Sequence, residues 1–206
     1  MSSVSVLHRT AATAPPMWSA HAIGDPARAP VEDFIRTVYA ERFGADLTHF
    51  APTLVSLSNG HRVVAAAGYR SAGTDRLFLE AYLRAPIERM LAASHGAATA
   101  RARVVEVGHL AAASAGDAMR LMSMLGMHLS AQGFHWVVCT TTEELRHLFG
   151  RLGVATLVLG RAEPAALGED ARHWGSYYEH QPTVLAGYLP SALQQLARRS
   201  ARAGAA

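Results

Sequence analysis

The feature that most constrains the fold is a regular alternation of extended and helical segments in the second half of the chain. Three strand-like runs alternate with two helical runs, at residues 103–113, 115–133, 134–142, 143–153 and 154–160. A strand that is followed by a crossover helix and another strand forms a parallel pair, with the helix on the face of the sheet. We therefore expect a sheet that is at least partly parallel and is covered by helices.

The first half of the chain predicts a helix followed by an antiparallel hairpin. Residues 30–44 begin with Pro30, carry acidic side chains in the next turn and end at Gly44, which is typical of one helix. The runs "TLVSLS" (53–58) and "RVVAAAGYR" (62–70) flank the turn sequence "NGH". Asn-Gly between two strand-like runs is a strong hairpin signal, so part of the sheet should be antiparallel.

The remaining segments complete a mixed order of elements. Residues 76–83 fit either a short strand or the lead into a helix at 86–94, and residues 161–182 have loop or short-helix character. A last strand at 183–189 and a basic helix at 191–203 follow. Hairpins followed by strand–helix crossovers predict an α/β (α+β) fold, a three-layer α/β/α arrangement around a mixed sheet.

Composition suggests one domain with short flanking segments. Residues 1–30, rich in Ala, Pro and Ser, are predicted to be a lead-in with a first strand near Val4–His8. Residues 31–189 carry the domain, and residues 190–206 form a basic C-terminal helix and tail. We see no internal repeat and no linker that would split the chain.

Charge and cysteine content exclude several classes of protein. The 19 basic and 16 acidic side chains are interspersed, which argues against a nucleic-acid binder. Cys139 is the single cysteine, so no internal disulfide forms. The sequence has no secretory signal and no apolar run of about 18 residues, so we expect a cytoplasmic protein that does not enter the membrane. Histidine and cysteine spacings predict no metal site.

One carboxylate, Glu106, interrupts the apolar strand "RVVEVGHLAAA" (103–113). Burying an isolated carboxylate is costly unless it has a partner or a raised pKa, so Glu106 is either a catalytic base or half of a salt bridge. A regular strand would place Glu106 and His109 on opposite faces. A β-bulge near Gly108 would bring them together, and we predict both as catalytic candidates on that condition.

Three further features each allow two interpretations. The small residues from Ala111 to Gly116 precede a helix start, which suits either a phosphate or an ordinary turn capped by Asp117. Cys139 is a candidate nucleophile, but its strand context favours a small buried side chain. The segment "HWGSYYEHQP" (173–182) could form an acceptor pocket or a cap over the core.

A row of methionines in the 115–133 helix is also open to two interpretations. It comprises Met119, Met122, Met124 and Met127. Methionine fills gaps in hydrophobic cores and also forms adaptable binding surfaces. The row therefore predicts either core packing or an adaptable wall for an acyl chain.

Several phrases, read together, resemble the thermostable hemolysin family. They are "PTLVSLSNGHRVVAAAGYRSA", "LFLEAYLRAPIE", "VVEVGHLAA", "GFHWVVCTTTEELRHLFGRLG" and "WGSYYEHQPTVLAGYL", in the expected order over most of residues 31–189. The family's "EVGNLA" is "EVGHLA" here, with His109 in place of Asn. That family resembles the GCN5-related N-acetyltransferases and, among them, the acyl-homoserine-lactone synthases.

The resemblance implies a splayed central sheet that binds a thioester donor. Strands 103–111 and 134–140 should separate and admit a phosphopantetheine arm. The implied donor-binding residues are Val107, Leu110, Ala111, Gly116, Thr140, Thr141 and Arg146. The acetyltransferase pyrophosphate loop, Q/R-x-x-G-x-G/A, is missing at 111–117, which favours an acyl carrier protein over coenzyme A as donor. The candidate contacts for that acidic partner are Arg101, Arg120, Arg146, Arg151, Arg198 and Arg199.

The activity that the resemblance implies is N-acylation, with Glu106 as base and His109 orienting it or binding the acceptor. A fatty acyl group would pass directly from acyl-phosphopantetheine, or from acyl-CoA, to an amino acid or an aromatic amine such as anthranilate, with no tightly bound cofactor. The predicted acceptor-binding residues are Tyr69, Arg70, Trp174, Tyr177 and Tyr178, the last two also being candidate acids. A homodimer is left open. The alternatives are a membrane-active hemolysin and a non-catalytic acyl-thioester binding module.

Overall fold

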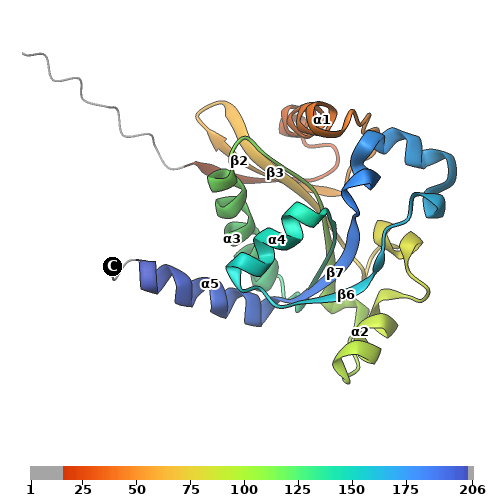
Figure 1. The fold of residues 1–206 in the computed structure, drawn as a ribbon. Helices are drawn as coiled ribbons and strands as arrows, with labels where there is room; N and C mark the ends of the chain where they lie inside the picture. Colours follow the sequence, from red (N-terminus) through yellow and green to blue (C-terminus); the bar gives the residue numbers. More distant parts are fainter. Residues whose placement is uncertain (1–15, 204–206) are drawn as a thin grey trace, which may run out of the picture.

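The computed structural model describes residues 16–203, which form a seven-stranded mixed sheet in the order β1-β2-β3-β4-β5-β7-β6 (Figure 1). The strands are β1 (Met17–His21), β2 (Thr53–Asn59), β3 (Arg62–Ser71), β4 (Val104–Ala112), β5 (Trp136–Thr141), β6 (Thr156–Arg161) and β7 (Thr183–Tyr188). The α-helices are α1 (Ala29–Phe43), α2 (Ile87–His95), α3 (Ala115–Ala131), α4 (Glu143–Leu152) and α5 (Leu189–Ala203). The 3₁₀ helices are η1 (Pro26–Arg28), η2 (Phe78–Tyr82), η3 (Arg101–Arg103) and η4 (Pro164–His180).

The sheet is antiparallel at both ends and parallel at one place. Strands β1 to β4 pair antiparallel in sequence order, β5 and β6 both pair antiparallel with β7, and β4 pairs parallel with β5. The β2–β3 hairpin turns at Gly60 and His61, between the paired Asn59 and Arg62, and Gly60 has a φ of +62°. The predictions of a mixed sheet and of this hairpin are confirmed.

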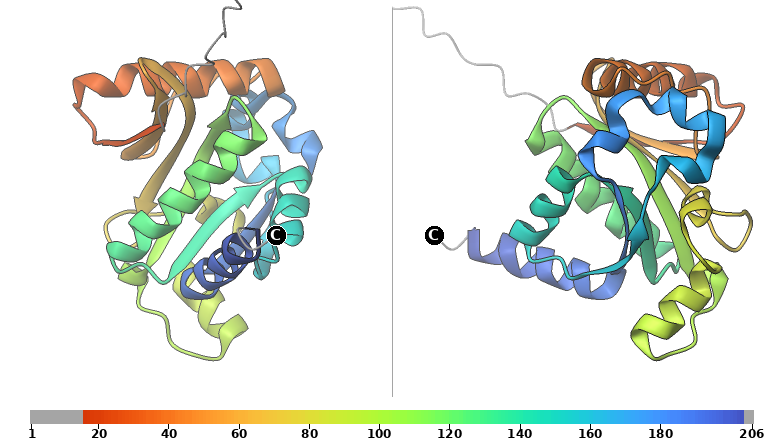
Figure 2. Two further views of the ribbon diagram at one scale, coloured as in Figure 1. Left: turned by 90° about the vertical axis from the view of Figure 1, so that its left-hand side faces the viewer. Right: turned by 45° about the vertical axis from the view of Figure 1, so that its right-hand side comes forward.

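Helices cover both faces of the sheet, as the three-layer prediction requires (Figures 1 and 2). The crossovers β4–α3–β5 and β5–α4–β6 advance across the sheet in the same direction, so right-handed connections place α3 and α4 on one face. Leu121 and Leu125 of α3 pack there, and α5 lies beside them. On the other face α1 packs through Val31 and Ile35 and is accompanied by α2 and η4.

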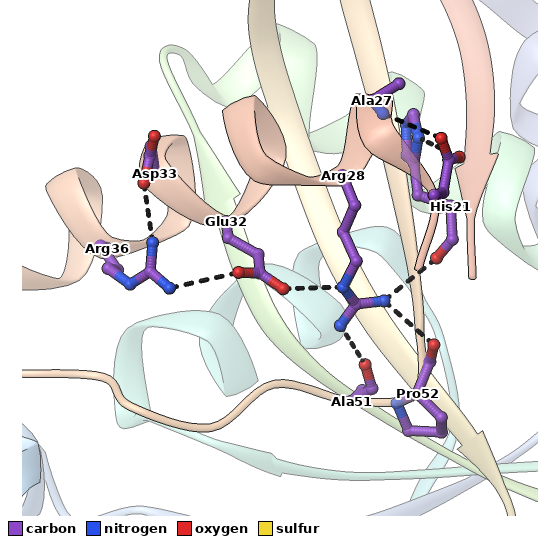
Figure 3. A network of polar contacts seen from close by, with 9 residues as sticks. His21, Ala27, Arg28, Glu32, Asp33, Arg36, Ala51 and Pro52 are labelled. Atoms are coloured by element: carbon purple, nitrogen blue, oxygen red, sulfur yellow. Dashed lines mark hydrogen bonds and ion pairs between the residues drawn. The ribbon is translucent and has the colours of Figure 1, made fainter. Parts of the chain in front are cut away.

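The lead-in prediction was wrong between residues 16 and 30, because β1 and η1 form there. The reason is the buried Arg28, whose guanidinium donates to the carbonyls of His21, Ala51 and Pro52 and forms an ion pair with Glu32 (Figure 3). These contacts join β1, α1 and the segment that precedes β2. The predicted strand near Val4–His8 lies outside the described residues.

The ambiguous segment at 76–83 forms the 3₁₀ helix η2. Glu80 holds it in place, because its carboxylate accepts hydrogen bonds from the N–H groups of Leu77 and Ile87. Arg101 donates to both oxygens of the same carboxylate. Burial raises the pKa of Glu80, but these hydrogen bonds outweigh burial and bring the pKa to about 2. The segment leads into α2 at Ile87, as one of the two predicted alternatives has it, and it does not form a strand.

Candidate active site

The sheet opens between β4 and β5. The two strands pair over three residue pairs only, from Val104–Trp136 to Glu106–Val138. Beyond Glu106, β4 follows β3, and beyond Val138, β5 follows β7. Each strand then leads into a helix, so the N-termini of α3 and α4 lie at the open end. The predicted splay is therefore present.

A cavity of about 430 Å³ occupies this opening, and we call it the β4–β5 cavity. Tyr39 and Arg42 of α1 line it from one face of the sheet, whereas α3, α4 and α5 line it from the other. The cavity therefore passes through the sheet where the strands separate. Its volume lies within the range of roughly 300–1,000 Å³ that is usual for small-molecule sites.

The walls of the β4–β5 cavity divide into a polar and an apolar part. The polar part includes Ser114, Thr140, Thr141, Thr142 and Tyr177, close to the open end of the strands. Side chains of α3 and α4, among them Met119, Met122, Leu125, Leu145, Leu148 and Phe149, form much of the apolar part. Such a site suits a ligand with a polar head and a long apolar tail.

Glu106 lies at the last residue pair before the strands separate, and its side chain is buried. Its Oε2 accepts a hydrogen bond from the N–H of Phe78 at 2.7 Å, and its Oε1 accepts one from Leu79 at 2.9 Å. Arg70 Nε lies 3.8 Å from Oε2. The carboxylate thus anchors η2. It also has an arginine neighbour, as the interpretation of Glu106 as half of a salt bridge required.

Burial raises the pKa of Glu106, and this effect exceeds the lowering by the N–H groups of Phe78 and Leu79 and by Arg70. A carboxyl group with a raised pKa and a fixed orientation suits a general base. Glu106 is not itself part of the cavity wall, but the next residue, Val107, is. Cys139, which lines the cavity, interacts electrostatically with Glu106, so the carboxylate lies near the cavity on the η2 side of the sheet.

A β-bulge in β4 brings His109 to the face of Glu106. The register with β3 shifts between Ala66 and Gly68, and His109 has a φ of +54°. The ring lies 5.4 Å from that of Phe50, and its Nδ1 lies 3.2 Å from where a Cβ on Gly68 would be. This confirms the kink on which the joint role of Glu106 and His109 depends.

The imidazole of His109 is neutral and has an unsatisfied nitrogen. Burial lowers its pKa to about 4, against a contact with the backbone of His49 that raises it. Its Nδ1 is buried and has no hydrogen-bond partner within residues 16–203. His109 also lines the β4–β5 cavity, while its Nδ1 lies against Gly68.

Cys139 is the first residue of β5 beyond the paired region, and it lines the cavity. Burial, together with the nearby charge of Glu106, raises the pKa of its thiol to about 12. A thiol that keeps its proton is a weak nucleophile. The structure thus agrees with the interpretation of Cys139 as a packed side chain, although it is placed in a ligand cavity.

The predicted donor-binding residues are only partly brought together. Val107, Leu110, Thr140 and Thr141 line the cavity. Ala111 instead packs on the α1 side and Gly116 is exposed on α3. Arg146 donates to the carbonyls of Thr141 and Gln181 and to the Thr183 hydroxyl, so it holds α4 against β7.

The predicted acceptor-binding residues are also divided. Tyr177 lines the cavity, and its hydroxyl donates to the Thr140 carbonyl at 3.2 Å. Trp174 and Tyr178 pack beside it on the α1 face, whereas Arg70 lies next to Glu106. Tyr69 faces α3 and shares hydrogen bonds with His128 and Gln132 there. Because neighbouring residues of a strand point to opposite faces, Tyr69 and Arg70 cannot serve one site.

Among the six arginines predicted to contact a carrier protein, Arg101 and Arg146 bind side-chain or backbone partners within the chain. Arg101 binds Glu80 and Glu88, and Arg146 is held as described above. Arg120 and Arg198 are exposed, and Arg151 lines the cavity. The side chain of Arg199 lies outside the part of the chain whose burial is described.

Sequence analysis missed the contributions of α1 and α5 to the cavity. Tyr39 and Arg42 lie on α1, which was predicted only as a packing helix, and Arg42 forms an ion pair with Glu144 of α4. The leucines of α5 were overlooked because the helix was judged by its basic residues. Their helical spacing was the signal that could have revealed an apolar face.

The methionine row is divided between the two interpretations. Met119 and Met122 line the β4–β5 cavity. Met124 packs against the core beneath α3, and Met127 is exposed.

Within the described residues, no cluster of His, Cys, Asp or Glu has the composition of a metal site, and no helix is long and apolar enough to cross a membrane.

With this geometry established, comparison with known proteins identifies the family. The thermostable hemolysin domain matches residues 21–193, most of the chain. The chain belongs to the thermostable hemolysin family. The match includes both strands of the splay and the bulge of β4. No curated protein sequence matches this member of the thermostable hemolysin family.

Solved structures show which fold this thermostable hemolysin family member has. FeeM, an N-acyl amino acid synthase from uncultured soil microbes, is 18% identical with a TM-score of 0.59, over 87% of this chain and 95% of that one. The acyl-homoserine-lactone synthase LasI is 12% identical with a TM-score of 0.57, over 84% and 91%. BjaI, a CoA-dependent acyl-homoserine-lactone synthase, is 16% identical with a TM-score of 0.58, over 89% of each chain. The chain has the fold of these synthases.

Proposed function

We propose that this protein is an N-acyltransferase that moves a fatty acyl group from a thioester to the amine of a small acceptor. The observation that carries the proposal is the β4–β5 cavity, which crosses the sheet beside the buried Glu106 and has a long apolar wall. A fold shared with N-acyl amino acid and acyl-homoserine-lactone synthases supports it. The splay supplies the place where donor and acceptor meet.

The donor thioester lies in the opening between β4 and β5. Strand residues beyond Glu106 and Val138 no longer pair with each other, so backbone groups at these edges can bind the oxygens of a phosphopantetheine arm. The acyl tail extends between α3 and α4, along Met122 and Leu148. N–H groups fixed at the splay would stabilise the oxyanion that forms when the carbonyl is attacked.

The acceptor amine approaches from the side of Glu106. Its nitrogen forms a bond to the thioester carbon, the carbon–sulfur bond breaks, and Glu106 takes the amine proton directly or through a water. Arg70 is partly exposed next to Glu106 and suits the carboxylate of an amino acid or of an aromatic amine such as anthranilate. His109 lines the cavity and can contact the acceptor there.

The leaving thiolate needs a proton, and Tyr177 is the better placed of the two predicted acids. Its hydroxyl lies at the polar wall of the cavity, and burial raises its pKa so that it remains protonated. The hydroxyl of Tyr178 is paired with that of Tyr82 at 2.7 Å, and Tyr178, unlike Tyr177, does not line the cavity. Proton transfer from Tyr177 would return the donor as a free thiol.

We propose an acyl carrier protein as the donor, as the missing pyrophosphate loop favours. The exposed Arg120 on α3 and Arg198 on α5 are available for an acidic partner. Coenzyme A is the other donor of the same chemistry. The test therefore includes both.

Mass spectrometry of reaction mixtures tests the proposal. Purified protein is mixed with octanoyl to hexadecanoyl acyl carrier protein, or with the matching CoA thioesters, and with pooled amino acids and aryl amines. We expect free thiol and a new amide, with formation slowed by about 10²–10⁴-fold in Glu106→Gln.

The Glu32→Gln variant is the matched control, because Glu32 is also a half-buried, ion-paired carboxylate but lies on α1 outside the cavity wall. No amide from any donor would contradict the proposal. Tight thioester binding without turnover would then indicate a binding module. Leakage of liposomes at low protein concentration would indicate a membrane-active protein.

A further inference from the structure

The helix α5 carries one apolar stripe, and that stripe lines the β4–β5 cavity. It comprises Leu189, Ala192, Leu193 and Leu196, whose i, i+3, i+4 and i+7 spacing places them on one side of the helix. Residues on the far side, such as Gln194, are exposed. The apolar side of α5 therefore faces the cavity.

A glycine of α3 allows α5 to lie close to it. A Cβ on Gly126 would be 3.2 Å from Cδ2 of Leu193 and 3.7 Å from Cδ1 of Leu189. Gly126 also lines the cavity. Because a side chain at this position would press on both leucines, the distance between α3 and α5 depends on the glycine. The helix α5 is thus built into the cavity wall.

The cavity extends from the splay towards α5. Its α3 lining begins at Ala115, beside the open end of the strands, and continues to Leu129, about 21 Å along the helix axis. The helix α5 begins at the other end, since the N–H of Leu189 donates to the carbonyl of His135 just before β5. A ligand with its reactive carbonyl at the splay would point its tail at α5.

We infer that α5 sets the length of the fatty acyl group that the cavity accepts. The small side chain of Ala192 leaves space for the methyl end of the acyl chain. This inference rests on the proposed function for the identity of the ligand. Ala192 is the one small side chain of a stripe that is otherwise leucine. Burial of each methylene strengthens binding by about fourfold. Filling the space that about three methylenes occupy should therefore weaken binding of the long acyl chain on the order of fiftyfold.

The decisive variant is Ala192→Leu, and Ala197→Leu is the matched control at an exposed position of the same helix, outside the cavity wall. Binding of straight-chain fatty acids from octanoate to hexadecanoate to the full chain is measured by calorimetry. We expect Ala192→Leu to bind the longest acid held by the wild type about fiftyfold more weakly and short acids equally well. Ala197→Leu should match the wild type.

A second variant, Leu196→Ala, enlarges the same region and should shift the preference towards longer acids. Equal weakening at every length, no change at any length, or no binding of fatty acids by the wild type would overturn the inference. The binding assay needs no turnover. Absence of amide formation together with a length shift would therefore refute the proposed function and leave α5 as the length-selecting wall of a binding protein.

Discussion

Glu106 and Phe78 meet at the last residue pair before the sheet opens, where the Phe78 N–H donates to the carboxylate at 2.7 Å. The contact fixes the orientation of the carboxylate and joins η2 to β4. Glu80 and Arg101 fix η2 in turn, and neither lies in the cavity wall. The proposed base is therefore positioned by an ion pair that lies outside the cavity wall.

The first prediction concerns the pH dependence of acyl transfer. Burial raises the pKa of Glu106, so the rate should increase with pH through a value above the usual glutamate pKa of about 4.3. Only the ionised form can accept the amine proton. Initial rates measured against pH should show this rise in the wild type and lose it in Glu106→Gln.

Two variants separate Glu106 from its neighbours in that measurement. The pKa of His109 is lowered to about 4, so His109 is neutral over the range in question and His109→Asn should keep the rise. Glu80→Gln should keep it as well. A rise that disappears in His109→Asn would contradict the assignment to Glu106.

The second prediction concerns stability in acid. The pKa of Glu80 is lowered to about 2 in the folded protein. A carboxyl with a lowered folded pKa stabilises the protein above its unfolded pKa of about 4.3, and this contribution is lost as pH falls towards 2. Glu80→Gln should therefore lower the free energy of unfolding by about 1–3 kcal/mol at pH 7.

Urea unfolding of the wild type and of Glu80→Gln over a series of pH values measures this difference. The two curves should converge as pH falls through 2. Asp33→Asn is the control, because Asp33 forms an exposed ion pair with Arg36 that should contribute little. A constant difference between wild type and Glu80→Gln at all pH values would contradict the prediction.

Much of the fold was predictable because its signals are local. The turn at Gly60 and His61 and the strand–helix crossovers from residue 103 to 161 are properties of short segments. The strand β1 was not predictable from composition, since the buried Arg28 stabilises it through carbonyls that are distant in sequence. Long-range pairing of this kind leaves no periodic pattern.

The candidate site was predictable at the one position where a charged residue occurs within an apolar strand. Glu106 stood out as a carboxylate in an apolar strand, and a bulge was suggested by Gly108. The cavity wall was harder to predict, because Arg42 and Leu193 are distant from β4 and β5 in the sequence. They meet these strands only at the opening of the folded sheet. Arg101 and Arg146 looked available in the sequence but bind partners within the fold.

The third prediction concerns the left-handed backbone of His109. A φ of +54° costs most non-glycine residues roughly 1–2 kcal/mol, and a β-branched residue is the least suited to it. His109→Val should therefore lower the free energy of unfolding by more than His109→Asn. Urea denaturation of both variants measures the difference, with the exposed His135→Val as control. Equal stability of the two variants would argue against the bulge.

The fourth prediction concerns Cys139. Direct attack by the amine requires no acyl-enzyme, and burial raises the pKa of this thiol to about 12. Cys139→Ala should retain acyl transfer close to the wild-type rate. Intact-mass analysis of the wild type after incubation with thioester alone should show no added acyl group. A stable adduct that is lost in Cys139→Ala would instead indicate a covalent route.

The last prediction concerns the ion pair between Arg42 of α1 and Glu144 of α4, both of which line the cavity. Both side chains are well exposed, so the pair should contribute only about 0–1 kcal/mol to stability. Arg42 lies near the start of α4, where the splay is open, and suits the phosphate of a donor arm. Arg42→Gln should raise KM for the donor roughly tenfold with kcat little changed.

Arg36→Gln is the matched control for Arg42, because it removes a similar ion-paired arginine from the same helix but outside the cavity wall. Steady-state kinetics against the donor, at saturating acceptor, separate the two. Glu144→Gln should act in the opposite direction, since it frees Arg42 for the phosphate. A KM that is equally unaffected in Arg42→Gln and Arg36→Gln would show that the donor phosphate lies elsewhere.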